Sequence, residues 1–193
     1  MTQPRPAVPP SQDYATESVI FPAILLSRES IQRIYQECRN RAINAARTGM
    51  PGVRLTVRGL LPSDLGETNE IWSDQLTTTA NAYQNSIIAS QNIANERYIG
   101  IYGLTYIGTQ AVRALRWTVK ATKIAVWDLT PILSDDVRLD ARTGYTPAPF
   151  IVPQNIGVTV EQYPLGGVEA GIQAANIAYL GVVVEKAGRT IDV

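Results

Sequence analysis

Apolar and polar residues alternate with a period of two through much of the chain after residue 52. This period is typical of a strand that buries one of its two faces. Clusters of Gly, Pro, Asn and Asp separate the alternating segments. About eight short strands at this spacing predict a mainly β protein, folded as a β-sandwich or a barrel. The expected strands are residues 18–26, 53–61, 69–76, 97–108, 116–133, 149–153, 156–164 and 176–188.

Two of these segments depart from simple alternation. The apolar residues of 116–133 change parity between Ala121 and Ile124, which indicates either a β-bulge or a strand that leaves one sheet for the other at a corner. Residues 179–184, "YLGVVV", are apolar at successive positions. We therefore expect them to form a central strand that is buried on both faces.

The segment between the first two strands has a helical period instead. Ser27 is a suitable N-cap and Gly49, followed by Pro51, is a suitable end, so the sequence predicts one N-terminal amphipathic helix between them. Its apolar stripe contains Ile31, Ile34, Tyr35, Cys38, Ala42 and Ala45. The rest of its surface carries Arg28, Arg33, Arg39, Arg41 and Arg47, against Glu29 and Glu37.

A basic helix in a chain whose formal net charge is zero has two interpretations. The first is a core helix with a solvated arginine face. The second is a surface on which the five arginines face an anionic lipid membrane or a nucleic acid.

Residues 1–16 contain Pro4, Pro6, Pro9 and Pro10 and few apolar side chains that are able to pack. This composition predicts an extended arm, the alternative being a frayed terminus without a role. The expected organisation is an arm at 1–16, a strand and the helix at 17–51 and the β-sandwich at 52–193. Residues 17–193 are expected to form one folded domain.

The chain is sparsely charged for its 193 residues. Charged residues make up 18% of it, whereas a typical globular domain has about 25%. Such a chain is weakly protected against association, so we expect a homo-oligomer in which other subunits cover much of the surface. The alternative is a monomer with a polar surface rich in Thr, Asn and Gln.

The sequence contains no histidine and a single cysteine, Cys38. This excludes Ser-His-Asp and Cys-His catalysis and nearly all zinc or iron arrangements. The glycines of 97–108 do not have the spacing of a nucleotide-binding loop, and the aspartates of 133–143 lack the calcium-loop pattern. We expect a protein that is not an enzyme and that has no catalytic residues, no metal, no cofactor and no small-molecule substrate.

Neither a signal peptide nor an apolar run of about 20 residues is present, so we expect no transmembrane segment and synthesis in the cytoplasm.

Tyr98, Tyr102 and Tyr106 share one parity of the strand expected at 97–108, which indicates a packed face or, alternatively, a sugar-binding platform. The three tryptophans, which we expect to anchor the core or an interface, are Trp72, Trp117 and Trp127.

The layout of the β region resembles a known class of proteins. Its segments are "VRGLLPSDLG", "NEIW", "ERYIGIYGLTY", "IAVWDL", "GYTPAPFIVPQNIGVTVEQY" and "YLGVVVEKAG". Over roughly residues 52–190 they resemble small single-jelly-roll capsid proteins of tailless icosahedral viruses, in particular those with an internal membrane that infect thermophilic bacteria or archaea. The resemblance is one of layout and strand phrasing and includes no diagnostic motif.

This resemblance implies a single eight-stranded jelly roll that stands upright beside copies of itself in the shell of a virion. The shell would cover a lipid membrane and a genome, and a second capsid protein would be a partner. The alternative function is a jelly-roll binding module that recognises a carbohydrate or a receptor through loops such as 131–148. Candidates for the subunit interface are Pro4, Pro6, Pro9, Trp72, Tyr98, Tyr102 and Tyr106.

Overall fold

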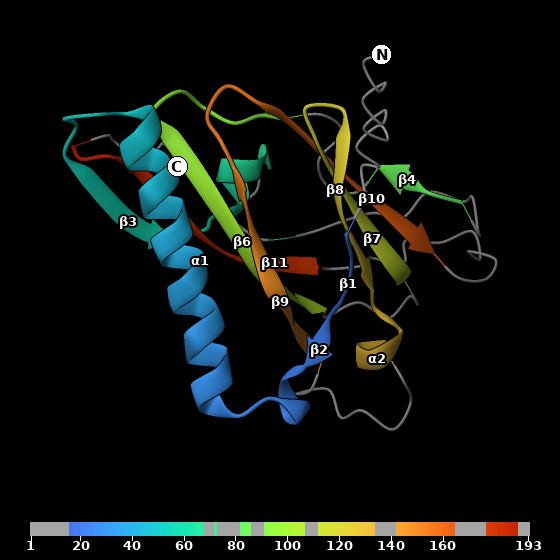
Figure 1. Cartoon of the computed structure of the whole chain (residues 1–193). Helices are drawn as coiled ribbons and strands as arrows, with labels where there is room; N and C mark the ends of the chain where they lie inside the picture. Colours follow the sequence, from blue (N-terminus) through green and yellow to red (C-terminus); the bar gives the residue numbers. More distant parts are fainter. Residues whose placement is uncertain are drawn as a thin grey trace, which may run out of the picture.

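Two β-sheets and one long helix make up the described part of the chain (Figure 1). The predicted mainly β class with one N-terminal amphipathic helix is therefore confirmed. The computed structural model describes residues 16–67, 72, 82–85, 91–106, 112–133, 142–164 and 177–188.

The described strands divide between two sheets, here called sheet A and sheet B. Sheet A contains, in spatial order, β1 (Thr16–Val19), β8 (Thr122–Asp128), β7 (Val112–Val119), β10 (Gly157–Pro164) and β4 (Gln84–Asn85), and β5 (Gln91–Asn92) also pairs with β10. Sheet B contains β2 (Phe21–Pro22), β9 (Thr143–Val152), β6 (Arg97–Tyr106), β11 (Ile177–Lys186) and β3 (Leu55–Gly59). Among the described strands β1 and β8 are parallel, and the other pairings are antiparallel.

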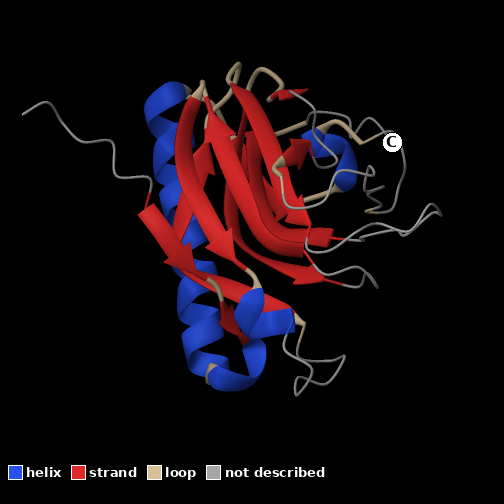
Figure 2. Ribbon diagram, turned by 90° about the vertical axis from the view of Figure 1, so that its right-hand side faces the viewer, coloured by secondary structure: helices blue, strands red, loops and turns tan. Residues whose placement is uncertain are grey.

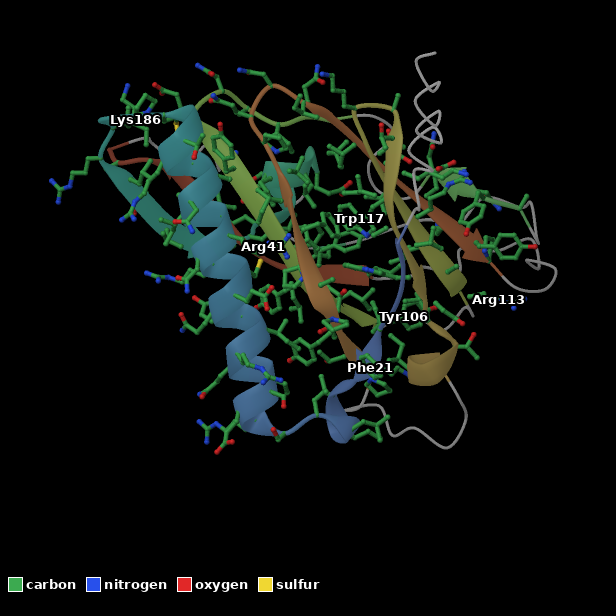
Figure 3. All side chains as sticks on the ribbon, viewed as in Figure 1. Phe21, Arg41, Tyr106, Arg113, Trp117 and Lys186 are labelled. Atoms are coloured by element: carbon green, nitrogen blue, oxygen red, sulfur yellow. The ribbon has the colours of Figure 1, made fainter. Side chains whose placement is uncertain are left out.

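The two sheets face each other across one hydrophobic core, here called the inter-sheet layer. Trp117 of β7 and Trp127 of β8 are fully buried in it, with their ring centroids 5.6 Å apart. The Trp117 ring also lies 4.9 Å from the ring of Tyr179 on β11 and 5.2 Å from that of Phe150 on β9. Aromatic contacts therefore connect sheet A to sheet B, and Figure 3 shows Trp117 between them.

The helix α1 (Arg28–Gly49) lies on the outer face of sheet B, against β6, β9 and β11 (Figure 2). The predicted cap and end are confirmed, because the Ser27 hydroxyl accepts a hydrogen bond from the Ser30 backbone N–H at 3.1 Å and the helix ends at Gly49. We call the contact between α1 and sheet B the helix layer. The residues that α1 buries there are Ile34, Cys38, Ala42 and Ala46.

Small residues bring α1 close to sheet B. A Cβ atom at Gly100 of β6 would lie 2.7 Å from the Cys38 sulfur, so the helix rests where the strand has no side chain. The predicted stripe is confirmed at Ile34, Cys38 and Ala42. In the last turn Ala46 is fully buried, whereas Ala45, which the prediction named, is partly buried.

Before the helix, the chain crosses from one sheet to the other. β1 pairs with β8 at one edge of sheet A, β2 pairs with β9 at one edge of sheet B, and Ile20 between them is fully buried. Residues Ala23–Leu25 form a 3-10 turn, η1. The prediction of one strand over 18–26 is therefore wrong, because the segment contains parts of two short strands in different sheets, followed by this turn. Pro22 precedes this turn and has no N–H with which to continue a sheet ladder.

The prediction of a single strand over 116–133 is also wrong. β7 and β8 form an antiparallel hairpin, joined by Lys120 and Ala121, whose φ angles are 50° and 62°. A two-residue turn with positive φ at both positions matches the twist of the flanking strands. A register shift leaves Ile124 as an extra residue in β8, so a bulge is present, but both strands stay in sheet A and the corner alternative is wrong. A helical turn, α2 (Thr130–Leu133), follows.

A second bulge lies in β6, whose pairing with both β9 and β11 skips Tyr102. Tyr98 and Tyr102 belong to the helix layer, whereas Tyr106 lies in the inter-sheet layer. The prediction that these three tyrosines share one face is therefore wrong for Tyr106, because the bulge reverses the alternation.

The prediction for residues 179–184 is confirmed, since β11 lies between β6 and β3 with Val183 in the inter-sheet layer and Val184 in the helix layer. The described residues contain eleven strands where about eight were expected, and β1, β2, β4 and β5 have at most four residues each. The strand expected at 69–76 lies outside the described residues apart from Trp72.

Candidate interaction surface

The outward side of α1 is the most basic helical surface that the structure describes. Arg28, Arg33, Arg41 and Arg47 are exposed and Arg39 is half-buried. The five arginines and the two glutamates of α1 give this surface a formal charge of +3, counted as 5 − 2. Figure 3 labels Arg41 at this helix.

Among the described residues α1 forms one ion pair, between Arg41 and Glu37, and this pair leaves the basic character of the helix intact. The Arg41 guanidinium lies 3.6 Å from the Glu37 carboxylate, and both side chains are 50% exposed. Such an exposed pair contributes little to stability because solvent screens it. The described ion pairs therefore leave the other four arginines of α1 available to an anionic partner.

Beneath α1, tyrosine rings and a thiol fill the helix layer. The Tyr102 ring meets Tyr35 of α1 edge-on at 5.7 Å and stacks on Tyr145 of β9 at 6.3 Å. Burial raises the pKa of Tyr102 to about 12, and burial likewise raises the pKa of Cys38 to about 12. Both groups are therefore protonated at neutral pH, and they act here as packing residues.

An apolar tip, formed by Phe21, Ile24 and Leu25, lies where the chain enters α1. These side chains are 41%, 64% and 68% exposed, and they are three of the four exposed large apolar side chains among the described residues. Figure 3 shows Phe21 at the same end of the molecule as the first turn of α1.

A groove of about 470 Å³ opens beside the apolar tip, between the first half of α1 and the strands β2 and β9. Apolar side chains form part of its wall and polar side chains of α1 form the rest. The apolar residues are Phe21, Leu26, Ile34 and Pro147. The polar residues are Ser30, Arg33 and Glu37.

Four charged residues form a ring at one end of the inter-sheet layer. Arg58 of β3 donates two hydrogen bonds of 2.7 Å to the Asp64 carboxylate and one of 2.8 Å to Glu185. Arg97 lies 2.8 Å from Asp64 and 3.1 Å from Glu185. The hydrogen bond to Asp64 raises the pKa of Arg58, against the opposing effect of burial. This charge-balanced ring joins β3, β6, β11 and the 3-10 turn η2 (Pro62–Leu65).

The outer face of sheet A carries a smaller polar cluster. Arg116 donates two hydrogen bonds of 2.6 Å to Glu161, and its guanidinium lies 3.9 Å from the centre of the Tyr83 ring. The Tyr83 ring meets Tyr163 edge-on at 5.3 Å. The hydrogen bonds to Glu161 and the pairing with Tyr83 raise the pKa of Arg116.

The residues that we named for a subunit interface lie in different environments. Tyr98 and Tyr106 are 6% and 2% exposed, so they offer little surface to a partner. Tyr102 is half-buried, and Trp72 packs edge-on against Tyr179 at 5.5 Å. Pro4, Pro6 and Pro9 and the aspartates of 134–141 lie outside the described residues.

Sequence reasoning missed both the groove and the charged ring. Each is assembled from residues distant in sequence, and no local spacing brings Phe21 to Pro147 or Arg58 to Glu185. Only the apolar run 23–26, which we assigned to a short strand, indicated the tip. In the described part of the chain no cluster of three potential metal ligands is present, and no helix is long and apolar enough to cross a membrane.

No protein-family model matches the sequence, and no curated protein is significantly similar to it.

Proposed function

We propose that this chain is a shell subunit, a single jelly-roll protein that assembles laterally with copies of itself, as capsid proteins do in a virion. The observation that carries the jelly-roll part of this proposal is the strand pairing. The strands from β3 to β11 pair from the outside of the sequence inward. The first, β3, pairs with the last, β11, and the next two, β4 and β5, both pair with β10. Then β6 pairs with β9, and β7 with β8, all of these pairs being antiparallel. That is the pairing of one long hairpin.

The remaining two main pairings, β11·β6 and β10·β7, are those expected when such a hairpin is rolled into two sheets. On this proposal β4 and β5, which both pair with β10, count as one of the eight strands of a jelly roll, and β1 and β2 are additions at the two edges. Jelly rolls occur in viral capsid proteins and also in lectins and cupins. The fold alone therefore does not select a function.

The composition of the whole chain favours the shell over the other jelly-roll functions. Only 18% of the residues are charged and the formal net charge is zero, which favours association. On this proposal the basic side of α1 faces an anionic layer, the internal membrane or the genome, and a second capsid protein is a further partner. The protein's place is then the virion, after synthesis in the host cytoplasm.

The first test is the mass of the purified chain, measured by light scattering coupled to size exclusion, with negative-stain electron microscopy of the same fractions. We expect discrete multimers, sheets or shells, because the sparse charge leaves association surfaces weakly screened. A strict monomer at high concentration contradicts the proposal.

The basic side of α1 is tested on vesicles that contain anionic lipid, at low salt. Replacing Arg33, Arg39 and Arg41 together by Gln should weaken binding about 100-fold, since each basic residue near such a surface contributes about 1 kcal/mol. The matched control removes three exposed positive charges from β7, β8 and their turn, through Arg113→Gln, Lys120→Gln and Lys123→Gln. Equal loss in both variants contradicts a specific role for α1.

The second candidate function is a binding module for a carbohydrate or a receptor. The cluster of Tyr83, Tyr163 and Arg116 on sheet A favours it, because aromatic rings beside a polar side chain are common in sugar sites. A monomer that binds members of a glycan array, and that loses this binding in Tyr83→Ala, supports the module over the shell.

A further inference from the structure

The lining of the groove beside the apolar tip suits an extended, proline-rich chain. Phe21 and Pro147 provide a ring and a proline at its wall, and Leu26 and Ile34 extend the apolar lining. Grooves with aromatic and proline walls bind polyproline II segments, which are extended before binding and therefore lose little conformational entropy.

The polar residues of the groove fit the same occupant. A polyproline II chain has no internal hydrogen bonds, so its carbonyl groups need donors. Arg33 supplies such donors at the groove, and Glu37 supplies an acidic group for a basic side chain.

The chain itself contains a segment with this chemistry. Residues 1–15 include "PRPAVPP", in which Pro4, Pro6, Pro9 and Pro10 favour polyproline II and Arg5 is the basic residue. We propose that the groove of one copy binds the proline-rich segment of a neighbouring copy, with the proline rings against Phe21 and Pro147 and Arg5 beside Glu37.

The position of Thr16 favours a neighbouring copy over the segment's own chain. β1 runs from Thr16 toward Ile20 and β2, so the chain at Thr16 leads away from the Phe21 wall of its own groove. Fifteen residues of polyproline II span about 45 Å. A compact chain of 193 residues has a radius of gyration of only about 16 Å. The segment is therefore long enough to reach beyond its own subunit.

This inference rests on the proposed self-assembly, and disulfide trapping between full-length chains tests it. One batch carries Ser11→Cys, after the last proline of the segment, and the other carries Ser30→Cys in the groove. The native Cys38 is fully buried and does not compete. Ser30→Cys keeps the backbone N–H that bonds to Ser27. In a mixed sample with a copper-phenanthroline oxidant, we expect the S11C–S30C dimer to form at least about tenfold faster than a matched pair that uses Thr48→Cys, an exposed position at the far end of α1.

Equal rates for S30C and T48C overturn the inference. So does a chain carrying both S11C and S30C that, at high dilution, closes on itself faster than it links to another chain, since the groove then holds its own segment. Protection of S30C from a maleimide by anionic vesicles, with equal cross-linking rates, assigns the groove to a lipid surface and also overturns it.

Light scattering on the same samples distinguishes failure of this inference from failure of the shell proposal. Assembly without a preference for S30C removes only this inference, whereas a monomer removes the shell proposal as well. A second variant, Arg33→Ala in the S30C chain, should slow the cross-link severalfold, because it removes a donor to the proline carbonyls. Arg47→Ala, outside the groove, should not slow the cross-link. Equal effects of the two substitutions contradict the binding mode.

Discussion

The two faces of sheet B, one in the inter-sheet layer and one in the helix layer, are packed by side chains of different size. Between the sheets, large rings fill the space, with Trp117, Trp127 and Tyr179 in contact. Beneath α1, tyrosine rings are present as well, but small residues such as Ala42 and Gly100 let the helix approach the strands closely. The inter-sheet layer should therefore be sensitive to loss of volume and the helix layer to its addition, because interiors are close-packed.

Trp117→Ala should be the most damaging change. It removes a fully buried ring that contacts both sheets, and the expected loss of unfolding free energy is about 3–5 kcal/mol. Urea denaturation followed by far-UV circular dichroism measures it. Ile43→Ala, in the partly buried margin of the helix layer, is the comparison and should cost less. A smaller loss for Trp117→Ala than for Ile43→Ala contradicts the proposed difference between the layers.

Glu185→Gln should come next, because the charged ring closes one end of the inter-sheet layer. Glu185 and Arg97 share the parity of Val183 and Ile99, which lie in that layer. Removing this carboxylate leaves Arg58 and Arg97 with only Asp64, an excess positive charge in a largely buried site. We expect a loss of about 3 kcal/mol.

Glu37→Gln is the matched control for Glu185→Gln. It breaks an exposed pair with Arg41 and should change the unfolding free energy by less than about 0.5 kcal/mol. If both substitutions have the same small effect in urea denaturation, the ring does not hold the strands together as argued.

Gly100→Ala tests the helix layer by adding volume. The new methyl group would meet the Cys38 sulfur at 2.7 Å and Val182 at 3.1 Å, so we expect a loss of about 1–3 kcal/mol. Adding Cys38→Ala should recover part of this loss, since it removes the sulfur. Gly59→Ala, where no atom lies within 4 Å of the new methyl group, is the control and should be nearly neutral. If the double variant recovers none of the lost unfolding free energy, this contact does not set the distance between α1 and β6.

Features with local signals were predictable from the sequence. The helix bounds follow from Ser27 and Gly49, and the burial of β11 follows from its unbroken apolar run. The turn at Lys120 and Ala121 was not predictable in this way, because neither residue is the Gly or Asn that usually marks positive φ.

The bulge at Tyr102 depends on the partners of β6, which lie about 40–80 residues away, so parity along β6 alone assigned Tyr106 to the wrong face. The groove and the charged ring depend on the same long-range pairing. Phe21 reaches Pro147 because β2 pairs with β9, and Glu185 reaches Arg58 because β11 pairs with β3. These contacts follow from topology, and no segment of the sequence encodes them alone.

Gln162 is a polar residue on the face of β10 that points into the inter-sheet layer, and its replacement gives the smallest predicted effect. Tyr106, Trp117 and Trp127 of this layer also have a buried polar atom without a partner among the described residues, but Gln162 is the one whose whole amide is unpaired. It is fully buried on β10 with the same parity as Val158 and Val160, and neither polar atom of its amide has a hydrogen-bond partner in the described part of the chain. A buried amide without partners is destabilising, so Gln162→Leu, which keeps most of the volume, should raise the unfolding free energy by about 1 kcal/mol.

Gln162→Ala separates polarity from volume, because it also removes the amide but leaves a cavity that offsets the gain. The midpoints of urea denaturation should therefore rank Gln162→Leu above the original chain and above Gln162→Ala. A lower midpoint for Gln162→Leu than for the original chain means that the amide does have a partner in the folded protein. The inter-sheet layer would then be stabilised by a polar contact as well as by its rings, and the contrast with the helix layer would be one of chemistry as much as of side-chain size.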